Sequence, residues 1–160
     1  MIGIGVWNQE QNFTATSTSN TPQFPLESNY RSRANTWGNS DPFTFMRNNK
    51  KVYGFVMSMY EFAATIPTLW ERTWEFIEKH PHVMSANNSV DFLVDERGSN
   101  QYNLCHFWSN FEIASLEFYR SETYTKYFEF LDSTGGFFYE RWGDAPVHSL
   151  AFVPLPFNFS

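Results

Sequence analysis

Hydrophobic and polar positions divide the chain into two unlike parts. From Glu10 to Asn39 the sequence is rich in Ser, Thr, Asn, Gln and Pro, and its apolar residues recur with neither the period of a strand nor that of a helix. Residues 1–40 are therefore expected to be irregular or disordered, apart from a short strand at Ile2 to Trp7. An ordered domain is expected over residues 41–156, followed by a tail at 157–160.

Within that domain, helical and extended patterns alternate. Asp41 followed by Pro42 predicts the start of a short helix, because Asp caps helices and Pro suits their first position. A longer helix is expected after Thr68, where Thr68 and Glu71 match a capping box. Further helices are predicted at 121–134 and 144–152, strands at 52–59, 102–113 and 137–139, and a region of turns at 87–100. This alternation indicates an α/β fold.

Composition narrows the class of protein. The 160 residues suit one domain or part of a larger one, and the aromatic content of 20% with only 18% charged residues argues against disorder throughout. A net charge of −6 argues against nucleic-acid binding. The chain has no apolar run long enough to span a membrane, and its N-terminus lacks the basic flank of a signal peptide. Cys105 is the only cysteine, so no internal disulfide can form.

The stretch YNLCHFWSNFEI, from Tyr102 to Ile113, carries the first group of candidate site residues. In an extended conformation one face is largely apolar, whereas the other carries His106, Trp108, Asn110 and Glu112. Planar rings beside amide and carboxylate groups are typical of sugar-binding sites. Twelve residues exceed the usual strand length, so a break or bulge is expected. The alternative interpretation is an amphipathic strand whose polar face is only hydrated.

The stretch GGFFYERWGDAPVHS, from Gly135 to Ser149, carries the second group. Asp144 is explained simply as a helix N-cap, and Glu140 with Arg141 as a surface ion pair of little energetic value. However, Glu140, Arg141, Asp144 and His148 lie within nine residues of one another, beside Trp142. Acids and bases are concentrated in this way at functional sites.

These two stretches, together with DPFTFMRNNKKVYGF at Asp41 to Phe55, KVYGFVMSMYE at Lys51 to Glu61 and PTLW at Pro67 to Trp70, resemble one known family. The chain is identified as a member of the fungal α-1,2-mannosyltransferases, glycosyltransferase family 15. The resemblance covers about Asp41 to Pro156 with the motifs in family order.

The resemblance implies a GT-A-type domain with a mixed sheet flanked by helices, in a Golgi membrane enzyme whose active site faces the lumen. Such enzymes move mannose from GDP-mannose to a mannose hydroxyl of N- or O-linked glycans, with retention of configuration and with Mn²⁺. By resemblance, Glu112 is the nucleophile or stabilises positive charge during front-face substitution. Asp144 is the second acid. Substrate-binding residues are expected to be His106, Trp108, Asn110, Arg141 and Trp142.

The family's Glu-Pro-Asp motif and its downstream His segment do not occur in the sequence. The expected Mn²⁺ ligands are therefore missing, no residue is assigned to a metal, and His148 is not taken as a replacement. The chain is expected to be truncated at both ends, to lack the membrane anchor and a signal peptide, and to be inactive alone. Two alternatives stay open: a non-catalytic remnant that binds carbohydrate or a partner, and a chain that does not fold stably.

Overall fold

The structure is a computed structural model that describes residues 5–7, 41–84, 86, 88–95 and 100–155. Most of the segment predicted to be irregular, residues 1–4 and 8–40, lies outside the described residues, as does the tail at 157–160. The strand expected at Ile2 to Trp7 is confirmed for Gly5–Trp7.

Short antiparallel strands form two separate sheets. Strands β1 (Gly5–Trp7), β2 (Tyr53–Phe55) and β5 (Glu112–Ala114) make a three-stranded sheet with β2 in the centre. Strands β3 (Ser58–Tyr60) and β4 (Cys105–Phe107) make a two-stranded sheet. Helices and strands are thus combined as predicted, but every strand pair in the described residues is antiparallel rather than part of a mixed sheet.

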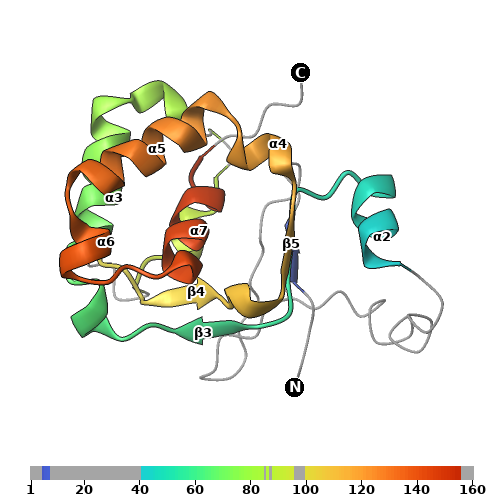
Figure 1. The fold of residues 1–160 in the computed structure, drawn as a ribbon, viewed down its shortest axis with the longest axis horizontal. Coiled ribbons are helices and arrows are strands. Elements are labelled where there is room, and N and C mark those ends of the chain that lie inside the picture. Colours follow the sequence, from blue (N-terminus) through green and yellow to red (C-terminus); the bar gives the residue numbers. More distant parts are fainter. Residues whose placement is uncertain (1–4, 8–40, 85, 87, 96–99, 156–160) are drawn as a thin grey trace.

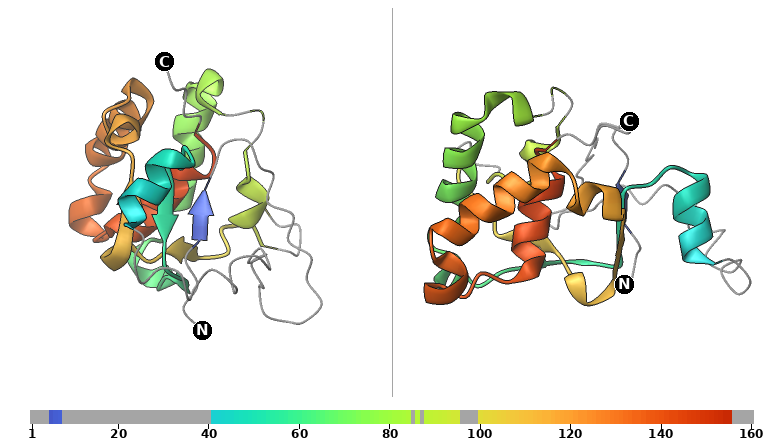
Figure 2. Two further views of the ribbon diagram at one scale, coloured as in Figure 1. Left: turned by 90° about the vertical axis from the view of Figure 1, so that its right-hand side faces the viewer. Right: turned by 45° about the horizontal axis from the view of Figure 1, so that its top comes forward.

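Helices lie mainly to one side of these sheets (Figures 1 and 2). The α-helices are α2 (Pro42–Asn48), α3 (Leu69–Lys79), α4 (Leu116–Tyr119), α5 (Glu122–Ser133), α6 (Gly136–Tyr139) and α7 (Asp144–Phe152). Short 3₁₀ turns occur at η2 (Ala63–Thr65), η3 (Pro81–Val83), η4 (Val90–Phe92) and η5 (Ser109–Phe111). Asp41 caps α2 and Ser121 caps α5, as predicted.

Helix α7 lies between the other helices and the two-stranded sheet (Figure 1). Seven of its nine residues are buried, which explains why it is apolar on most of its faces. Ser149 anchors it, because its hydroxyl accepts a hydrogen bond from the Phe107 amide at 2.7 Å and donates one to the Ala145 carbonyl at 2.8 Å. The helix is thereby held against β4.

Aromatic side chains fill much of the core. Phe118 and Phe152 stack with ring centres 3.9 Å apart, and Phe55 stacks on Phe107 at 4.0 Å. Tyr53, which is fully buried, packs between these pairs. Much of the high aromatic content therefore serves packing.

Three predicted strands are corrected. The strand expected at 52–59 is two strands, β2 and β3, which belong to different sheets. The extended stretch at 102–113 is interrupted by η5, which is the break expected from its length. The predicted strand at 137–139 is wrong, because these residues form α6 after a left-handed turn at Gly135, whose φ is +78°.

Tertiary contacts also override several local predictions. Thr68 makes no side-chain hydrogen bond to its own helix, so the predicted capping box is not formed. Asp144 is the first residue of α7 rather than its N-cap, which is Gly143. The predicted alternation of faces fails at His106, which is buried, and at Phe111, which is 61% exposed and lies in η5, where the extended conformation is interrupted.

Candidate active site

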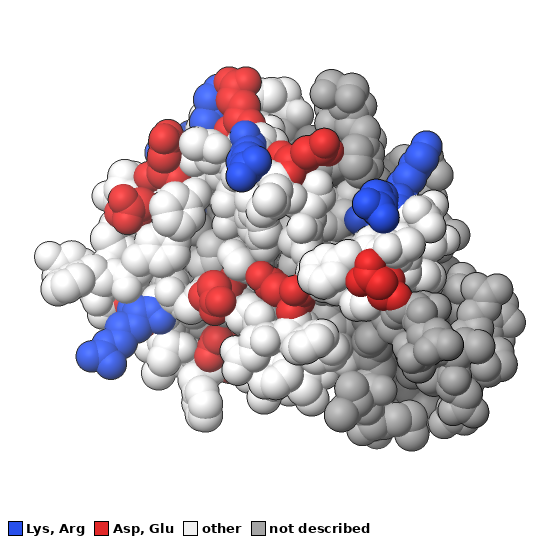
Figure 3. Space-filling view, turned by 45° about the vertical axis from the view of Figure 1, so that its right-hand side comes forward, with Lys and Arg blue, Asp and Glu red and all other residues white. Residues whose placement is uncertain are grey.

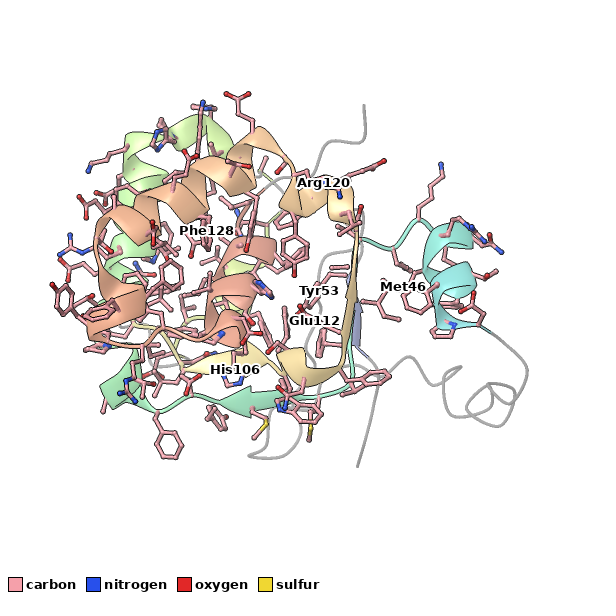
Figure 4. All side chains as sticks on the ribbon, viewed as in Figure 1. Met46, Tyr53, His106, Glu112, Arg120 and Phe128 are labelled. Atoms are coloured by element: carbon pink, nitrogen blue, oxygen red, sulfur yellow. The ribbon has the colours of Figure 1, made fainter. Side chains whose placement is uncertain are left out.

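Glu112 lies at the start of β5, on the side of the strand that faces α7 (Figure 4). The antiparallel register pairs Glu112 with Phe55 and Ala114 with Tyr53. Tyr53 is therefore the diagonal neighbour of Glu112 on the same face of the sheet, within reach of a long side chain. The Tyr53 hydroxyl donates a hydrogen bond to Oε2 of Glu112.

Two further groups reach Glu112 from the helices. The Tyr119 hydroxyl, at the end of α4, lies 3.3 Å from Oε1 of Glu112. Nδ1 of His148, on α7, lies 3.1 Å from the same oxygen and 3.1 Å from the Tyr119 hydroxyl. We call Glu112, Tyr53, Tyr119 and His148 the Glu112 cluster. Its four members come from β5, β2, α4 and α7, so packing of the whole domain is needed to assemble it.

The environment keeps Glu112 ionised. Burial opposes ionisation, but hydrogen bonds from His148, Tyr53 and Tyr119 outweigh it, and the pKa of Glu112 lies below its ordinary value. The same arrangement raises the pKa of Tyr53 and of Tyr119, first through burial and then through the nearby carboxylate. The two phenols are thus held as hydrogen-bond donors to a carboxylate anion.

Asp144 lies at the exposed start of α7, four residues before His148. Its charge acts on Tyr53, Tyr119 and Tyr124, and also on His106. Asp144 is therefore within electrostatic reach of Glu112's partners and of His106, which brings the two predicted acids into one region. Arg141, in the preceding loop, is exposed and has a positive φ of 64°.

The loop that carries Arg141 and Asp144 is held by Glu140. Its carboxylate accepts hydrogen bonds from the Thr68 amide at 3.1 Å, the Thr68 hydroxyl at 2.8 Å and the Trp142 indole at 2.7 Å. Trp142 is only 5% exposed, and its ring lies so close to Gly136 that an added Cβ would be 2.1 Å from it. The structure therefore places Trp142 in the core, and gives Glu140 a role in joining this loop to α3.

The remaining candidates lie along β4 and η5. His106 is buried, while Trp108 is half-buried and Asn110 exposed. The Trp108 amide donates to the Met57 carbonyl at 3.0 Å. The substrate-binding roles predicted for these residues, and for Arg141 and Trp142, stay predictions.

Sequence reasoning missed three members of the Glu112 cluster. It assigned no role to Tyr53 or Tyr119, and it did not assign His148 to the site. The position of Tyr53 could have been predicted from the sequence, because its strand is predicted and an antiparallel register would place it near Glu112. Tyr119 gave no local signal, and His148 stood out only as a member of the polar group at 140–148.

The described residues do not fit a metal ion. Among them, no group of three His, Cys, Asp or Glu side chains is arranged to hold one.

No helix in the described ranges is long and apolar enough to cross a membrane. On the face drawn in Figure 3, several acidic side chains gather near the middle, whereas further acidic side chains and the Lys and Arg side chains lie toward the edges.

Solved structures define the class of protein to which this fold and site belong. The chain is similar to the mannosyltransferase Ktr4p from S. cerevisiae in complex with GDP, with a TM-score of 0.69 and 47% identity over 73% of this chain and 32% of that one. It is also similar to core-mannan synthase A from Aspergillus fumigatus in its Mn/GDP form, with a TM-score of 0.68 and 45% identity over 72% of this chain and 33% of that one. The fold is part of a GT-A-type mannosyltransferase domain.

Sequence comparison gives the family. The profile of the family described as glycolipid 2-alpha-mannosyltransferase matches residues 33–156, and the chain belongs to this family. It is 61% identical over 113 residues to glycolipid 2-alpha-mannosyltransferase 2 of Candida albicans, which covers 71% of this chain and 24% of that protein. It is also 60% identical over 110 residues to the alpha-1,2 mannosyltransferase KTR1 of Saccharomyces cerevisiae. This match covers 69% of this chain and 28% of that protein. The chain thus spans about a quarter of the length of these relatives.

Proposed function

We propose that this chain carries the Glu112 side of the active site of a retaining α-1,2-mannosyltransferase, which moves mannose from GDP-mannose to a mannose hydroxyl of an N- or O-linked glycan. The observation that carries the proposal is the Glu112 cluster, in which three donors converge on one ionised carboxylate. The names of the relatives and the GDP in the Ktr4p complex support the choice of donor and linkage.

A carboxylate held in this way suits a reaction in which positive charge develops at the anomeric carbon. Fixed donors orient the group before the reaction, so no reorganisation is needed in the transition state. Both oxygens of Glu112 already accept hydrogen bonds, which weakens them as nucleophiles. This favours stabilisation of the oxocarbenium-like state over covalent attack, and a mannosyl adduct on Glu112 detected by mass spectrometry would contradict that preference.

In this proposal Asp144 orients the acceptor sugar, and His106, Trp108, Asn110 and Arg141 contact it or the donor mannose. Trp142 acts through packing of the loop. The enzyme would work on the lumenal side of the Golgi membrane, as the family resemblance implies. Because the described residues do not fit Mn²⁺, the roles proposed for this chain belong to its own side chains.

The test uses a chimaera in which residues 41–155 of this chain replace the matching segment of KTR1, where the two sequences are 60% identical. Transfer from GDP-mannose to methyl α-mannoside is measured with Mn²⁺ present. Glu112→Gln is expected to lower kcat by about 100- to 1000-fold, the range for loss of one preorganised electrostatic group. The matched control Glu117→Gln, on an exposed residue of α4, is expected to keep full activity.

Undiminished transfer by the Glu112→Gln chimaera would overturn the proposal. Binding of mannosides that is lost on Trp108→Ala and unchanged in Glu112→Gln would instead favour a non-catalytic carbohydrate-binding role. The relatives compared above are all named as transferases or synthases, so that alternative has no support from them.

A further inference from the structure

His106 has an enclosed ring nitrogen without a partner. Its side chain is 8% exposed, and Nδ1 is one of two buried side-chain nitrogen or oxygen atoms in the described residues that make no hydrogen bond. The other ring nitrogen, Nε2, is not among these enclosed atoms. An unsatisfied buried polar atom is costly, and in a native protein it calls for a specific explanation.

The group next to this nitrogen is Glu61, whose Oε2 lies 3.7 Å from Nδ1. Glu61 directly follows β3, and the register pairs Met59 with His106, so Glu61 is a diagonal neighbour of His106 on the same face. Its other oxygen, Oε1, accepts a hydrogen bond from the Phe62 amide at 2.9 Å. Its own amide donates to the Leu104 carbonyl at 2.8 Å. Glu61 is therefore held at both ends with Oε2 directed toward His106.

The His106 ring is kept neutral. Burial lowers the pKa of His106, although the charges of Glu61 and Asp144 act in the opposite direction. A neutral imidazole has one N–H donor and one acceptor nitrogen, and the partner of one nitrogen decides which is which. A carboxylate beside Nδ1 favours the proton on Nδ1, which leaves the lone pair on Nε2.

We propose that Glu61 positions His106 as the Nδ1–H tautomer, so that Nε2 accepts a hydrogen bond from a hydroxyl of the acceptor mannoside. Glu61 is thus a positioning residue that acts through His106. The assignment to the acceptor rests on the proposed function. Asp144 acts on His106 and on the tyrosines around Glu112, so the ring lies near the region where transfer would occur.

Charge distinguishes the two substrates. The negative charges of Glu61 and Asp144 both act on the ring. A diphosphate is repelled by such a site, whereas a neutral sugar hydroxyl is a suitable donor to an imidazole nitrogen. The geometry therefore favours the acceptor sugar over the nucleotide.

The first arm of the test examines the tautomer in the 160-residue chain itself by long-range ¹H–¹⁵N NMR of the histidine rings at neutral pH. His106 is expected to carry its proton on Nδ1, and Glu61→Ala is expected to abolish that preference. Glu61→Gln, whose amide oxygen can still accept from Nδ1, is expected to restore it, and Glu117→Ala serves as the control. The proposal fails if His106 in the wild-type chain carries its proton on Nε2, or if Glu61→Ala leaves the tautomer unchanged.

The second arm uses the KTR1 chimaera. Glu61→Ala is expected to raise KM for methyl α-mannoside about tenfold, equivalent to about 1.4 kcal/mol, with KM for GDP-mannose unchanged. An unchanged acceptor KM would overturn the contact with the sugar. If the chimaera without any of these substitutions is inactive, the proposed function is contradicted. The NMR measurement of the His106 tautomer would still test whether Glu61 positions His106.

Discussion

Two carboxylates of this domain, Glu112 and Glu140, look alike when hydrogen bonds are counted and differ in what donates them. Each accepts hydrogen bonds from distant segments, and each has a pKa below the ordinary value because those hydrogen bonds outweigh burial. The donors to Glu112 are two phenols and an imidazole. The donors to Glu140 are a backbone amide, an alcohol and an indole.

The difference separates a chemical site from a structural one. Phenol and imidazole groups can shift protons and charge as a substrate binds, whereas the amide and indole donors of Glu140 only fix geometry. A lowered pKa by itself therefore does not identify a functional acid. The donors therefore fit the proposed role of Glu112 as the reactive carboxylate, whereas Glu140 supports the loop that carries Asp144.

The largest effect on stability is expected around Glu140. In Gly136→Ala the new methyl group would meet the Trp142 ring at 2.1 Å, so the loop must shift, at a cost of about 3 kcal/mol in unfolding free energy. Gly143→Ala is the matched control, because its nearest contact would be 3.8 Å and the loss should stay within about 1 kcal/mol. Chemical denaturation measures both, and equal losses would show that the Trp142 contact is not restrictive.

Removal of the Glu140 carboxylate should cost less. Glu140→Ala leaves the start of α3 without an acceptor for Thr68 and leaves the buried indole N–H of Trp142 unpaired, for a loss of about 2 kcal/mol. Glu129→Ala, on an exposed position of α5, should change unfolding by less than about 0.5 kcal/mol. If Glu140→Ala unfolds at the wild-type denaturant concentration, Glu140 does not support the loop in the way its hydrogen bonds indicate.

The Glu112 cluster should respond in the opposite way, with activity changed more than stability. Tyr119→Phe removes the hydroxyl that lies 3.3 Å from Glu112 and 3.1 Å from His148. Transfer by the KTR1 chimaera should fall about tenfold, and unfolding free energy should change by about 1 kcal/mol. Tyr124→Phe is the control, because this neighbouring ring packs edge-on against Tyr119 and should lose little activity. Equal activities of the two variants would contradict a role for the Tyr119 hydroxyl.

The smallest effect is the dependence of stability on pH. Because the folded pKa of Glu112 lies below its value in the unfolded chain, near 4.5, ionised Glu112 stabilises the fold. This contribution is complete above about pH 4.5 and disappears as the pH falls through the lowered folded pKa. Urea unfolding between about pH 6 and 3 measures how steeply the free energy of unfolding falls with falling pH. In Glu112→Gln this fall should be less steep than in the wild type, by an amount equivalent to at most about one bound proton. An unchanged slope would mean that Glu112 has an ordinary pKa in the folded chain.

Local sequence signals were sufficient where local contacts decide. Helix α5 begins after Ser121 because the serine hydroxyl accepts the Tyr124 amide, which is a contact within one turn. They failed where distant groups compete. The side chain of Thr68 bonds Glu140, 72 residues away, in place of its own helix. Another failure is local: the aromatic run at 137–139 has strand propensity, yet it forms a helix after the left-handed Gly135, where Trp142 packs close to Gly136.

The sequence by itself determined the α/β class, the helices with strong end signals and, through two family motifs, Glu112 and Asp144 as the acids of interest. Only the tertiary structure decided what surrounds them. Tyr53 reaches Glu112 through the β2–β5 register, and Tyr119 and His148 reach it because α4 and α7 pack beside β5. The Glu61–His106 pair likewise depends on the β3–β4 register. Such partners are distant in the chain, and no periodicity along a single segment encodes which distant side chains will meet.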